Sequence, residues 1–376
     1  MRFLFVNQFI PPDEAPTSLL LGDLAGALEA EGHEVVWVGS QGGYRTRNVR
    51  WGGRMLREVA ALSSILLAGW KAPRCGVILC LSSPPLLLVV VRLMKFRHCG
   101  AKLIHWAMDL YPEVAVALGE VREGSLLHRF TAALMGGAYR DCDLVVALDA
   151  EMAERIGRHG VGCLIHPPWP PAIPTQSANE VPRPEAFVWL YSGNLGRAHE
   201  WRTVLEAQRL LEDRRLPITL VFQGSGPERS KAEAHASELG LQSCLWRSYA
   251  PNNQLLDSLL AADALIVTQR PETQGCLWPS KLALGLLLDR PIVWVGCGSG
   301  GIAKMLEERG HVVGRPGGAE DLAKSMETLF QSGVAAGKAD EVAKVQARVA
   351  EARAMAIGKL THDLLNRFGD PGKMLL

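Results

Sequence analysis

Short apolar runs alternate with amphipathic stretches through the first 165 residues. The runs resemble buried strands, whereas the stretches between them repeat apolar positions at helical spacing. Strands that alternate with helices form a parallel sheet that is covered on both faces. The pattern therefore predicts an α/β domain. Its predicted strands lie at 2–7, 33–39, 75–82, 101–109, 142–149 and 163–167, and its helices at about 17–31, 85–97, 125–140 and 150–160.

A proline-rich stretch interrupts this alternation at residues 166–185, where seven of twenty residues are proline. Proline cannot continue the hydrogen-bonded pattern of a helix or a strand, so this stretch is predicted to be a linker. The alternation then restarts and ends in a long helix at about 337–368. The second series of predicted strands lies at 187–193, 217–226, 243–248, 264–269, 291–296 and 311–314.

The pattern as a whole predicts two Rossmann-like α/β domains that face a cleft. Two domains are also the natural expectation for a chain of 376 residues, because each half is long enough to bury its own core. The predicted boundaries are 1–168 for the N-terminal domain, 169–185 for the linker and 186–354 for the C-terminal domain. Ligands of such sheets bind at the carboxyl ends of the strands, so the loops there are the first place to look for function.

The composition favours an ordinary globular protein. Apolar residues make up 48% and charged residues 21% of the chain, and the net charge is +1, so no overall field would attract nucleic acid. The eight cysteines are scattered without C-x-x-C spacing, which argues against zinc and favours free thiols in a reducing compartment. The N-terminus has no long apolar segment, and we interpret it as a first strand rather than a signal peptide.

One segment, residues 44–102, departs from this balance, because it holds eleven lysines and arginines and a single acid, Glu58. Its apolar runs are shorter than the ~18–20 residues that span a bilayer. Basic and apolar residues at helical spacing are typical of a helix that lies on an anionic membrane. The alternative is a buried helix with a solvated basic rim. The first interpretation predicts a cytoplasmic protein that is peripheral at the inner face of the plasma membrane.

Three strand ends of the second half lead through glycine-rich turns into helices, at 191–200, 221–227 and 271–281. Glycine lets the backbone approach a ligand closely, and a helix N-terminus offers N–H groups to an anion. Together the three turns favour a phosphate-bearing ligand, for which Lys281 would supply a positive charge. For any one turn, the alternative is simply the tight geometry of a strand-to-helix connection.

Several longer motifs follow one another in a recognisable order: SSPPL, IHWAMDLYPE, YSGNLGRAHE, VFQGSGP, SYAPNNQLLDSLLAADALIVT, PSKL and RPIVWVG. They span nearly the whole chain and resemble the retaining glycosyltransferases of family 4, in particular bacterial polysaccharide transferases of the colanic-acid or L-fucosamine type. The resemblance implies the GT-B fold, in which the last helix, here about 355–376, crosses back to the N-terminal domain. It implies that the C-terminal domain binds a nucleotide-diphosphate sugar with UDP or GDP, without metal or cofactor. The N-terminal domain would bind a lipid-linked or saccharide acceptor.

The resemblance also assigns residues to the donor. Negative charge grows on the departing diphosphate, so cations and preorganised N–H groups should matter most there, and Lys281 and Arg197 are the cations assigned as catalytic. Asn194 and His199 stand where many relatives have an arginine and a lysine. The residues implied to bind the donor are Gly193, Asn194, Gly196, Gly224, Ser225, Gly226, Tyr249, Gln274, Gly275 and Ser280.

Two acids that are common in the superfamily are missing from this chain. Gln274 stands where the branch more often has an acid before the glycine, and Leu284 stands where a second glutamate holds the ribose. Glu272 is the nearest acid that would compensate. The departure points either to an altered donor or to an inactive relative.

The acceptor side is assigned to the N-terminal domain. Pro12, Asp13 and Thr17 follow the first predicted strand in a loop that resembles the acceptor loop of the family. Asp109 and Glu113 follow a later strand, where a carboxylate would orient a hydroxyl of the acceptor or of the donor sugar. We assign Asp109 to catalysis and Glu113 to the acceptor side. The alternative for both is a cap on the next helix.

Two other motifs are predicted to be structural. Gly296, Gly298 and Gly301 fit G-x-G-x-x-G, but they follow the fifth strand of their domain, whereas a dinucleotide fingerprint follows the first. Asp141 and Asp143 imitate a metal-binding D-x-D at the start of a predicted strand. No metal site is predicted there or elsewhere.

Three functions remain open from the sequence. The first is a glycosyltransferase that acts at the membrane face. The second is a GT-B enzyme of another reaction, such as a nucleotide-sugar epimerase. The third is a non-catalytic GT-B protein in a polysaccharide assembly complex.

Overall fold

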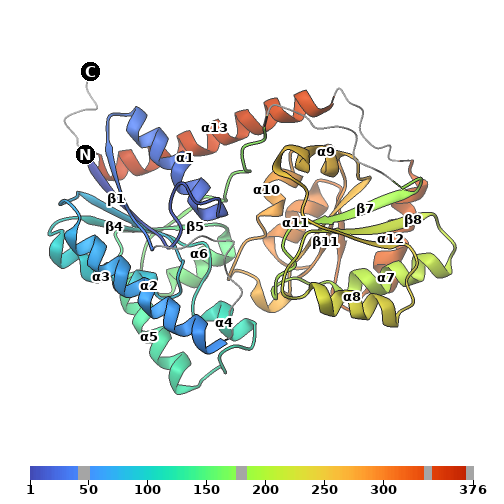
Figure 1. Ribbon diagram of the computed structural model, residues 1–376, viewed down its shortest axis with the longest axis horizontal. Helices are drawn as coiled ribbons and strands as arrows, with labels where there is room; N and C mark the ends of the chain where they lie inside the picture. The colour runs from blue at the N-terminus through green and yellow to red at the C-terminus, as the bar shows by residue number, and fades with distance from the viewer. Residues whose placement is uncertain (41–50, 175–183, 334–340, 370–376) are drawn as a thin grey trace. The chain divides into compact units, whose positions relative to one another are not determined.

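The computed structural model describes residues 1–40, 51–174, 184–333 and 341–369, of which 51–55 are described by their backbone alone. The chain divides into two compact units, each of which is an α/β sandwich of helices around a sheet (Figure 1). Unit 1 consists of Met1–Pro171, Gly275–Trp278 and Arg353–Leu376, and unit 2 of Ala172–Gln274 and Pro279–Ala352.

Unit 1 is built on a parallel sheet of six strands in the order β2-β1-β3-β4-β5-β6. The strand order changes direction between β1 and β3, so the loops after these two strands diverge at the carboxyl edge of the sheet. The strands are β1 (Arg2–Val6), β2 (Glu34–Val38), β3 (Val77–Cys80), β4 (Lys102–Trp106), β5 (Leu144–Ala147) and β6 (Cys163–Ile165).

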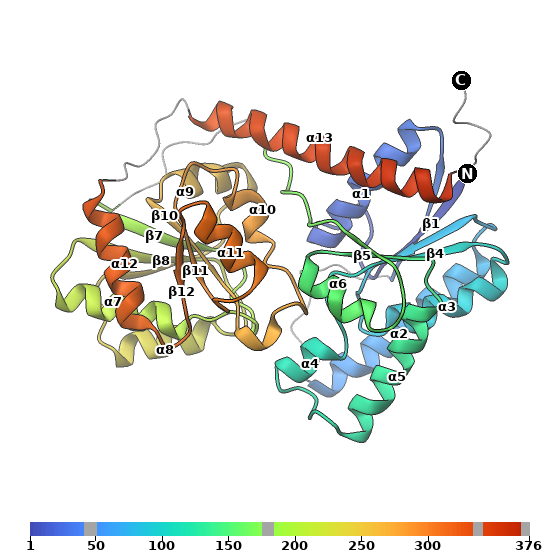
Figure 2. The same cartoon turned by 180° about the vertical axis from the view of Figure 1, so that it is seen from behind.

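Helices cover both faces of this sheet (Figures 1 and 2): α2, α3 and α5 lie on one face, and α1 and the second half of α13 lie on the other. Particular residues mark where several of these helices begin. The side chains of Ser125 and Asp149 accept the N–H groups of the first turns of α5 and α6, and a proline opens α1. The helices are α1 (Pro16–Ala30), α2 (Trp51–Lys71), α3 (Leu87–Arg97), α4 (Glu113–Ala117), α5 (Leu126–Arg140) and α6 (Ala150–Gly157).

Unit 2 holds a second parallel sheet of six strands, in the order β12-β11-β10-β7-β8-β9, with its change of direction between β10 and β7. The strands are β7 (Phe187–Ser192), β8 (Ile218–Gln223), β9 (Cys244–Arg247), β10 (Ala264–Thr268), β11 (Ile292–Val295) and β12 (Val312–Gly314). The helices are α7 (Arg202–Asp213), α8 (Arg229–Glu238), α9 (Leu255–Leu260), α10 (Lys281–Gly285), α11 (Gly301–Glu308), α12 (Ala319–Gln331) and α13 (Glu341–Phe368), with short 3₁₀ turns at Asn252–Gln254 and Pro271–Thr273.

Successive side chains of β7 enter two different cores, because neighbouring residues of a strand point to opposite faces of the sheet. Trp189 and Tyr191 pack with α7, α8 and α12. Val188 and Leu190 pack with α9, α10 and the first half of α13. Burial on both faces explains why this strand reads as a continuous apolar run rather than as an alternation.

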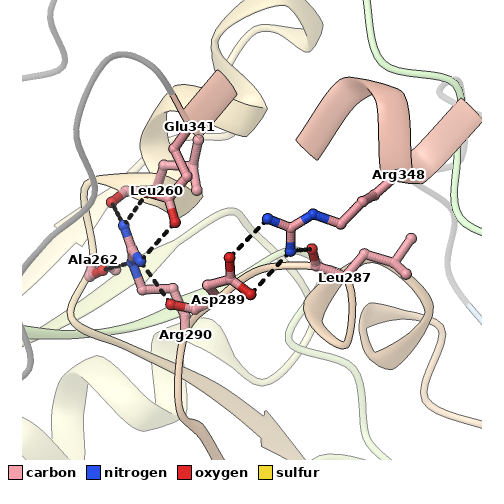
Figure 3. A network of polar contacts seen from close by, with 7 residues as sticks. All are labelled: Leu260, Ala262, Leu287, Asp289, Arg290, Glu341 and Arg348. Atoms are coloured by element: carbon pink, nitrogen blue, oxygen red, sulfur yellow. Dashed lines mark hydrogen bonds and ion pairs between the residues drawn. The ribbon is translucent and has the colours of Figure 1, made fainter. Parts of the chain in front are cut away.

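The first half of α13 is fastened to unit 2 by two arginines (Figure 3). Arg290, whose side chain is 3% exposed, pairs with Glu341 at 2.9 Å and also donates to the carbonyl oxygens of Leu260 and Ala262. Arg348 of α13 forms a two-pronged ion pair with Asp289, with N–O distances of 2.9 and 2.7 Å.

The second half of α13 belongs to unit 1, where other contacts hold it. Arg353 pairs with Asp23 of α1 at 2.8 Å, and the His166 ring lies 3.0 Å from the carbonyl oxygen of Ala356. The apolar side chains of Leu360 and Leu364 are fully buried in the core of unit 1.

The observed architecture confirms the predicted α/β fold with two Rossmann-like sheets. The predicted domain boundaries stay a prediction, and the two units divide between Pro171 and Ala172, inside the predicted linker. Gly275–Trp278 lies inside the predicted C-terminal domain and yet belongs to unit 1. Backbone contacts explain this. The Leu110 N–H donates to the carbonyl oxygen of Cys276 at 2.8 Å, and Asp109 forms an antiparallel bridge with Leu277.

Candidate functional site

The first candidate site lies at the change of strand direction in unit 2, where the loops after β7 and β10 diverge. Lys281, the first residue of α10, extends to the loop after β7. Its Nζ lies 3.4 Å from the carbonyl oxygen of Asn194 and 4.7 Å from the centre of the Tyr191 ring. The same carbonyl accepts the Tyr191 hydroxyl at 2.7 Å. The ammonium is thus held over an aromatic face beside a glycine turn.

The glycines of this region serve the contacts between loops. The loop after β7 and the loop after β8 pack together, with the Leu195 N–H donating to the Ser225 carbonyl at 2.7 Å. A Cβ on Gly224 would overlap the Gly193 carbonyl, and one on Gly226 would overlap the Leu195 carbonyl. All three glycines also have positive φ. The expectation that they open the backbone to a ligand is therefore not needed to explain them.

His199 lies at the end of the glycine turn after β7 and packs between β7 and β10. Its Nδ1 lies 2.9 Å from the Thr268 carbonyl oxygen, and its ring meets the edge of Tyr191. Since a carbonyl oxygen only accepts, Nδ1 carries the proton and Nε2 is left as the acceptor. Burial, with the nearby charge of Lys281, lowers the pKa of His199 to about 3. Burial also lowers the pKa of Lys281 to about 8. At neutral pH the turn therefore presents a charged lysine beside a neutral histidine.

Arg197, the second cation predicted to be catalytic, follows the same glycine turn. It lines a neighbouring pocket of about 240 Å³ whose wall includes Arg202, Lys231, Arg270 and the His199 ring. The two cations that the sequence grouped as catalytic thus occupy two adjoining places, and His199 lies between them.

The other residues that were predicted to bind the donor do not all lie at the glycine turn after β7. Tyr249 is 54% exposed and would contact a Cβ placed on Gly224, so it borders the turn. Ser280 is exposed just before α10, and Gln274 is half-buried. Gly275 belongs to unit 1, where a Cβ on it would meet Arg155 of α6.

Leu284, where the resemblance led us to expect a ribose-binding glutamate, is a core residue. Leu284 is 6% exposed and packs in the apolar core formed with α9 and α13. A carboxylate at that position would have to be buried among aliphatic side chains without a partner, which is costly. Glu272, the acid considered as a replacement, is exposed and pairs with Arg270 at 3.4 Å.

A second cluster of polar side chains lies at the change of strand direction in unit 1. Gln8 follows β1 and accepts the Ser83 hydroxyl at 3.0 Å, while Asn7 donates to Thr17 at 3.3 Å. Ser82 accepts the N–H of Asp109 at 3.3 Å. The sequence analysis named Thr17 and Asp109 but missed Asn7, Gln8 and the two serines. The available signal was that all four lie within three residues of the end of a buried strand.

Asp109 is the most perturbed carboxyl group of this cluster. Burial raises its pKa to about 6. Glu113, at the start of α4, has one buried carboxylate oxygen with no hydrogen-bond partner. Asp13 accepts the Ala15 N–H at 2.8 Å and so fixes the approach to α1, while Pro12 follows a cis peptide bond in the same loop.

Comparisons with known proteins add the following. No family model matches the sequence, and no curated protein matches it significantly. Solved structures do match over the whole chain. Sucrose-phosphate synthase from Thermosynechococcus elongatus is 15% identical, covers 98% of this chain and 100% of its own, and has a TM-score of 0.68. HepE from Anabaena, in complex with UDP and glucose, is 16% identical, covers 97% and 100%, and has a TM-score of 0.64. WaaG, a glycosyltransferase involved in lipopolysaccharide biosynthesis, is 16% identical, covers 98% and 99%, and has a TM-score of 0.57.

The chain has the GT-B fold. The predicted fold class is thereby confirmed, while membership of family 4 and of its colanic-acid branch stays a prediction.

Within this GT-B fold, the two motifs that were predicted to be structural have structural contacts. Asp143 accepts the Leu103 N–H at 2.9 Å and pairs with Lys95 and Lys102. A Cβ on Gly296 would overlap the Trp294 ring, which accounts for the first glycine of the G-x-G-x-x-G motif. Among the described residues, no group of side chains has the arrangement of a metal site.

The surface of unit 1 carries a concentration of exposed apolar side chains. Nine of the fourteen large apolar side chains that are exposed among the described residues lie on α2, α3 and α5. They are Leu56, Val59, Leu67, Trp70, Leu93, Phe96, Leu126, Leu127 and Phe130. None of the helices in the described ranges combines the length and apolar character that crossing a bilayer requires.

In the structure, acids from other parts of the chain partly balance the positive charge of the basic segment, residues 44–102. Arg92 pairs with Asp141, and Lys95 and Lys102 pair with Asp143, so two acids from outside the segment form ion pairs with three of its cations. Four of the bases counted in this segment cannot be placed against the membrane. Residues 45, 47 and 50 lie outside the described residues, and so does the side chain of residue 54.

Proposed function

We propose that this protein is a retaining, metal-independent glycosyltransferase that moves a sugar from a UDP or GDP sugar to a lipid-linked or saccharide acceptor. The observation that carries the proposal is the Lys281 ammonium, which is held over Tyr191 beside the Asn194 carbonyl at the change of strand direction of a nucleotide-binding type of sheet. HepE, which shares the fold, was crystallised with UDP-glucose as well as with UDP and glucose.

Lys281 would act on the leaving group. When the bond between sugar and diphosphate breaks, negative charge grows on the diphosphate, and a cation already in place stabilises that charge without reorganisation. The neutral His199 ring beside it offers an acceptor nitrogen, which suits a hydroxyl of the sugar or ribose rather than a phosphate. Leu284 leaves no carboxylate for the ribose, so the hydroxyl contacts must come from other groups of this turn.

The acceptor would bind to unit 1, at the cluster around Asp109. A carboxyl group with a pKa near 6 is largely ionised at neutral pH, and it would orient the attacking hydroxyl by accepting its hydrogen bond. Asn7 and the Ser83 hydroxyl lie in the same cluster and would orient the sugar ring through hydrogen bonds.

We place the protein at the inner face of the plasma membrane, in the cytoplasm. The exposed apolar side chains of α2, α3 and α5 support this placement, together with the exposed cations Arg57, Lys71 and Arg74. Apolar side chains beside cations favour an anionic lipid surface. A lipid-linked acceptor would then be reached without leaving the membrane.

A binding and turnover experiment tests the proposal. A panel of UDP and GDP sugars is first screened for a rise in melting temperature, because a ligand of the folded state must stabilise it. The stabilising donor is then incubated with lipid-linked acceptors, and the anomeric configuration of the product is read by NMR. We expect a product that keeps the configuration of the donor.

Other outcomes point to the competing functions. A donor that binds and is never turned over supports the non-catalytic GT-B protein. Conversion of the nucleotide sugar without an acceptor supports the epimerase. A panel that produces no shift in melting temperature contradicts the glycosyltransferase and the epimerase, because both must bind a nucleotide sugar.

A further inference from the structure

The pocket lined by Arg197 and His199, next to the glycine turn after β7 that Lys281 contacts, is mainly basic. Four cationic side chains line it, Arg197, Arg202, Lys231 and Arg270, and only two carboxylates share the lining. They come from the loop after β7, from α7, from α8 and from the loop after β10. Cations that converge from four places in the sequence indicate a site for an anion rather than a solvated charge run on one helix.

The two carboxylates of the lining are already engaged. Glu200 accepts the backbone N–H of Thr203 at 3.0 Å and its hydroxyl at 3.1 Å, which caps the start of α7. Glu228 pairs with Lys231 at 2.8 Å. Arg270 also pairs with Glu272, which is not a lining residue, at 3.4 Å. With Glu272 counted, the four bases outnumber the three acids by one, and the neutral His199 ring adds no charge.

Two neighbours restrain the side chain of Arg202, which could bind a planar anion. The guanidinium of Arg202 lies 5.2 Å from the centre of the Trp201 ring and 3.4 Å from His235. The aromatic contact and the contact of Nη1 with His235 restrain the guanidinium, which has five N–H groups and so keeps donors for a carboxylate or phosphate.

The size and place of the pocket limit what it can hold. Its volume is about 240 Å³, below the roughly 300–1,000 Å³ of pockets for drug-sized ligands, so it matches a single sugar or phosphate group better than a whole nucleotide. His199 forms part of its wall and also packs on Tyr191 beside Lys281. The pocket therefore adjoins the turn to which the diphosphate is assigned.

We propose that this pocket binds the carboxylate of an acidic donor sugar, so that the sugar moved is a uronic acid rather than a neutral hexose. This inference rests on the proposed glycosyltransferase function and specifies its donor. A carboxylate is a planar anion that a guanidinium suits, and in a uronic acid it is separated from the diphosphate by one sugar ring.

The experiment compares acidic and neutral donors by isothermal titration calorimetry. UDP-glucuronate and UDP-glucose are titrated into the full chain, into the pocket variant Arg202→Gln/Lys231→Gln, and into the control Lys304→Gln/Lys324→Gln. The control removes the same charge from exposed positions of α11 and α12 in unit 2. We expect the wild type and the control to prefer UDP-glucuronate by at least tenfold, and the pocket variant to lose that preference. GDP-mannuronate and GDP-mannose serve as the second pair.

The outcomes separate the two claims. Equal affinity of the wild type for acidic and neutral donors overturns the acidic-sugar inference and leaves the glycosyltransferase proposal intact. If no nucleotide sugar binds, the proposed function fails, and inorganic phosphate then probes the pocket by itself. Phosphate affinity that falls in the pocket variant and not in the control supports an anion site, whereas equal affinity in all three proteins overturns it.

Discussion

Lys281 is the residue on which the proposed chemistry depends most. If its ammonium stabilises the departing diphosphate, it contributes more in the transition state than in the bound donor. Lys281→Ala is therefore expected to lower kcat by roughly 10²–10³-fold and to weaken donor binding by less. Steady-state transfer assays and calorimetric donor titration measure the two quantities. Turnover equal to that of the wild type would exclude the role.

The pH dependence of the Lys281→Arg variant serves as the control. Because the pKa of Lys281 is about 8, the charged form declines above that pH, and kcat/KM of the wild type, which reports the free enzyme, should fall there. Arginine stays charged, so Lys281→Arg should recover part of the activity and should show no such fall.

Asp109 gives a second prediction, for stability against pH. Because its pKa is raised to about 6, the folded protein keeps this proton between pH 4 and 6 while the unfolded chain loses it, so stability falls as pH rises through that window. Asp109→Asn should remove this loss and stabilise the protein relative to wild type at pH 8, but not at pH 4. Urea unfolding at the two pH values measures the difference.

The matched control for that experiment is Asp289, whose pKa is lowered by its hydrogen bonds with Arg348. Its contribution to stability is present at neutral pH and is lost as pH falls through the folded pKa. Asp289→Asn should therefore lower stability at pH 8 and have less effect in acid. Equal pH dependence of both variants would contradict the assignment of a raised pKa to Asp109.

At the scale of residues, the sequence suggested individual site residues, whose roles stay predictions, but not their neighbours in space. Lys281 was predicted from its place after a glycine turn, and Asp109 from its place after a strand. The contact of Gln8 with Ser83 joins residues 75 positions apart, and only the strand order brings them together. A sequence does not show which backbone atoms pack against a glycine Cα. It therefore could not reveal the contacts between loops that Gly224 and Gly226 make.

At the scale of elements, the packing of the loops after β7 and β8 gives a sharp prediction. Gly224 has a φ of 136° and lies against the Gly193 carbonyl. Gly224→Ala should strain both loops, lower the free energy of unfolding by more than about 1 kcal/mol and weaken donor binding. Chemical denaturation and donor titration check the two effects.

Gly358 is the control for this substitution. It lies exposed within α13, and a Cβ there would meet nothing within 4 Å. Alanine favours a helix over glycine by about 0.8–1 kcal/mol, so Gly358→Ala should stabilise the protein. Destabilisation by both variants would show that the loops after β7 and β8 are not specially constrained.

The elements themselves were largely predictable, because amphipathic periodicity and capping residues are local. The helix predicted at about 17–31 is observed as Pro16–Ala30, and the one at 125–140 as Leu126–Arg140. The membership of Gly275–Trp278 in unit 1 was not predictable, since it follows from a backbone bond to Leu110, 166 residues earlier in the chain.

At the scale of the whole molecule, the anchor of α13 in unit 2 gives a stability prediction. Arg290→Met would leave the carboxylate of Glu341 buried without its partner, and loss of one member of a buried ion pair costs about 3–5 kcal/mol. Arg348→Met, which breaks the more exposed pair with Asp289, should cost about 0–1 kcal/mol. Urea denaturation of the two variants compares them, and equal losses would contradict the importance of burial.

Membrane contact is the other prediction at this scale. If α2, α3 and α5 lie on the bilayer, co-sedimentation with liposomes should rise with anionic lipid, by about 1 kcal/mol for each cation near the surface, and fall with salt. Leu126→Ser/Phe130→Ser should weaken it, while Met355→Ser, an equally exposed apolar position of α13, should not. Equal recovery with neutral and anionic vesicles would contradict the contact.

The division of unit 1 into three stretches of chain has a consequence for the order of synthesis. The ribosome completes the first 171 residues early, but the helix that covers one face of their sheet ends at Phe368. At about 5–20 residues per second, the emerging sheet waits roughly 10–40 s for that helix. The part of the protein that is made first is thus the part that is finished last, and until then its apolar face toward α13 is open to chaperones.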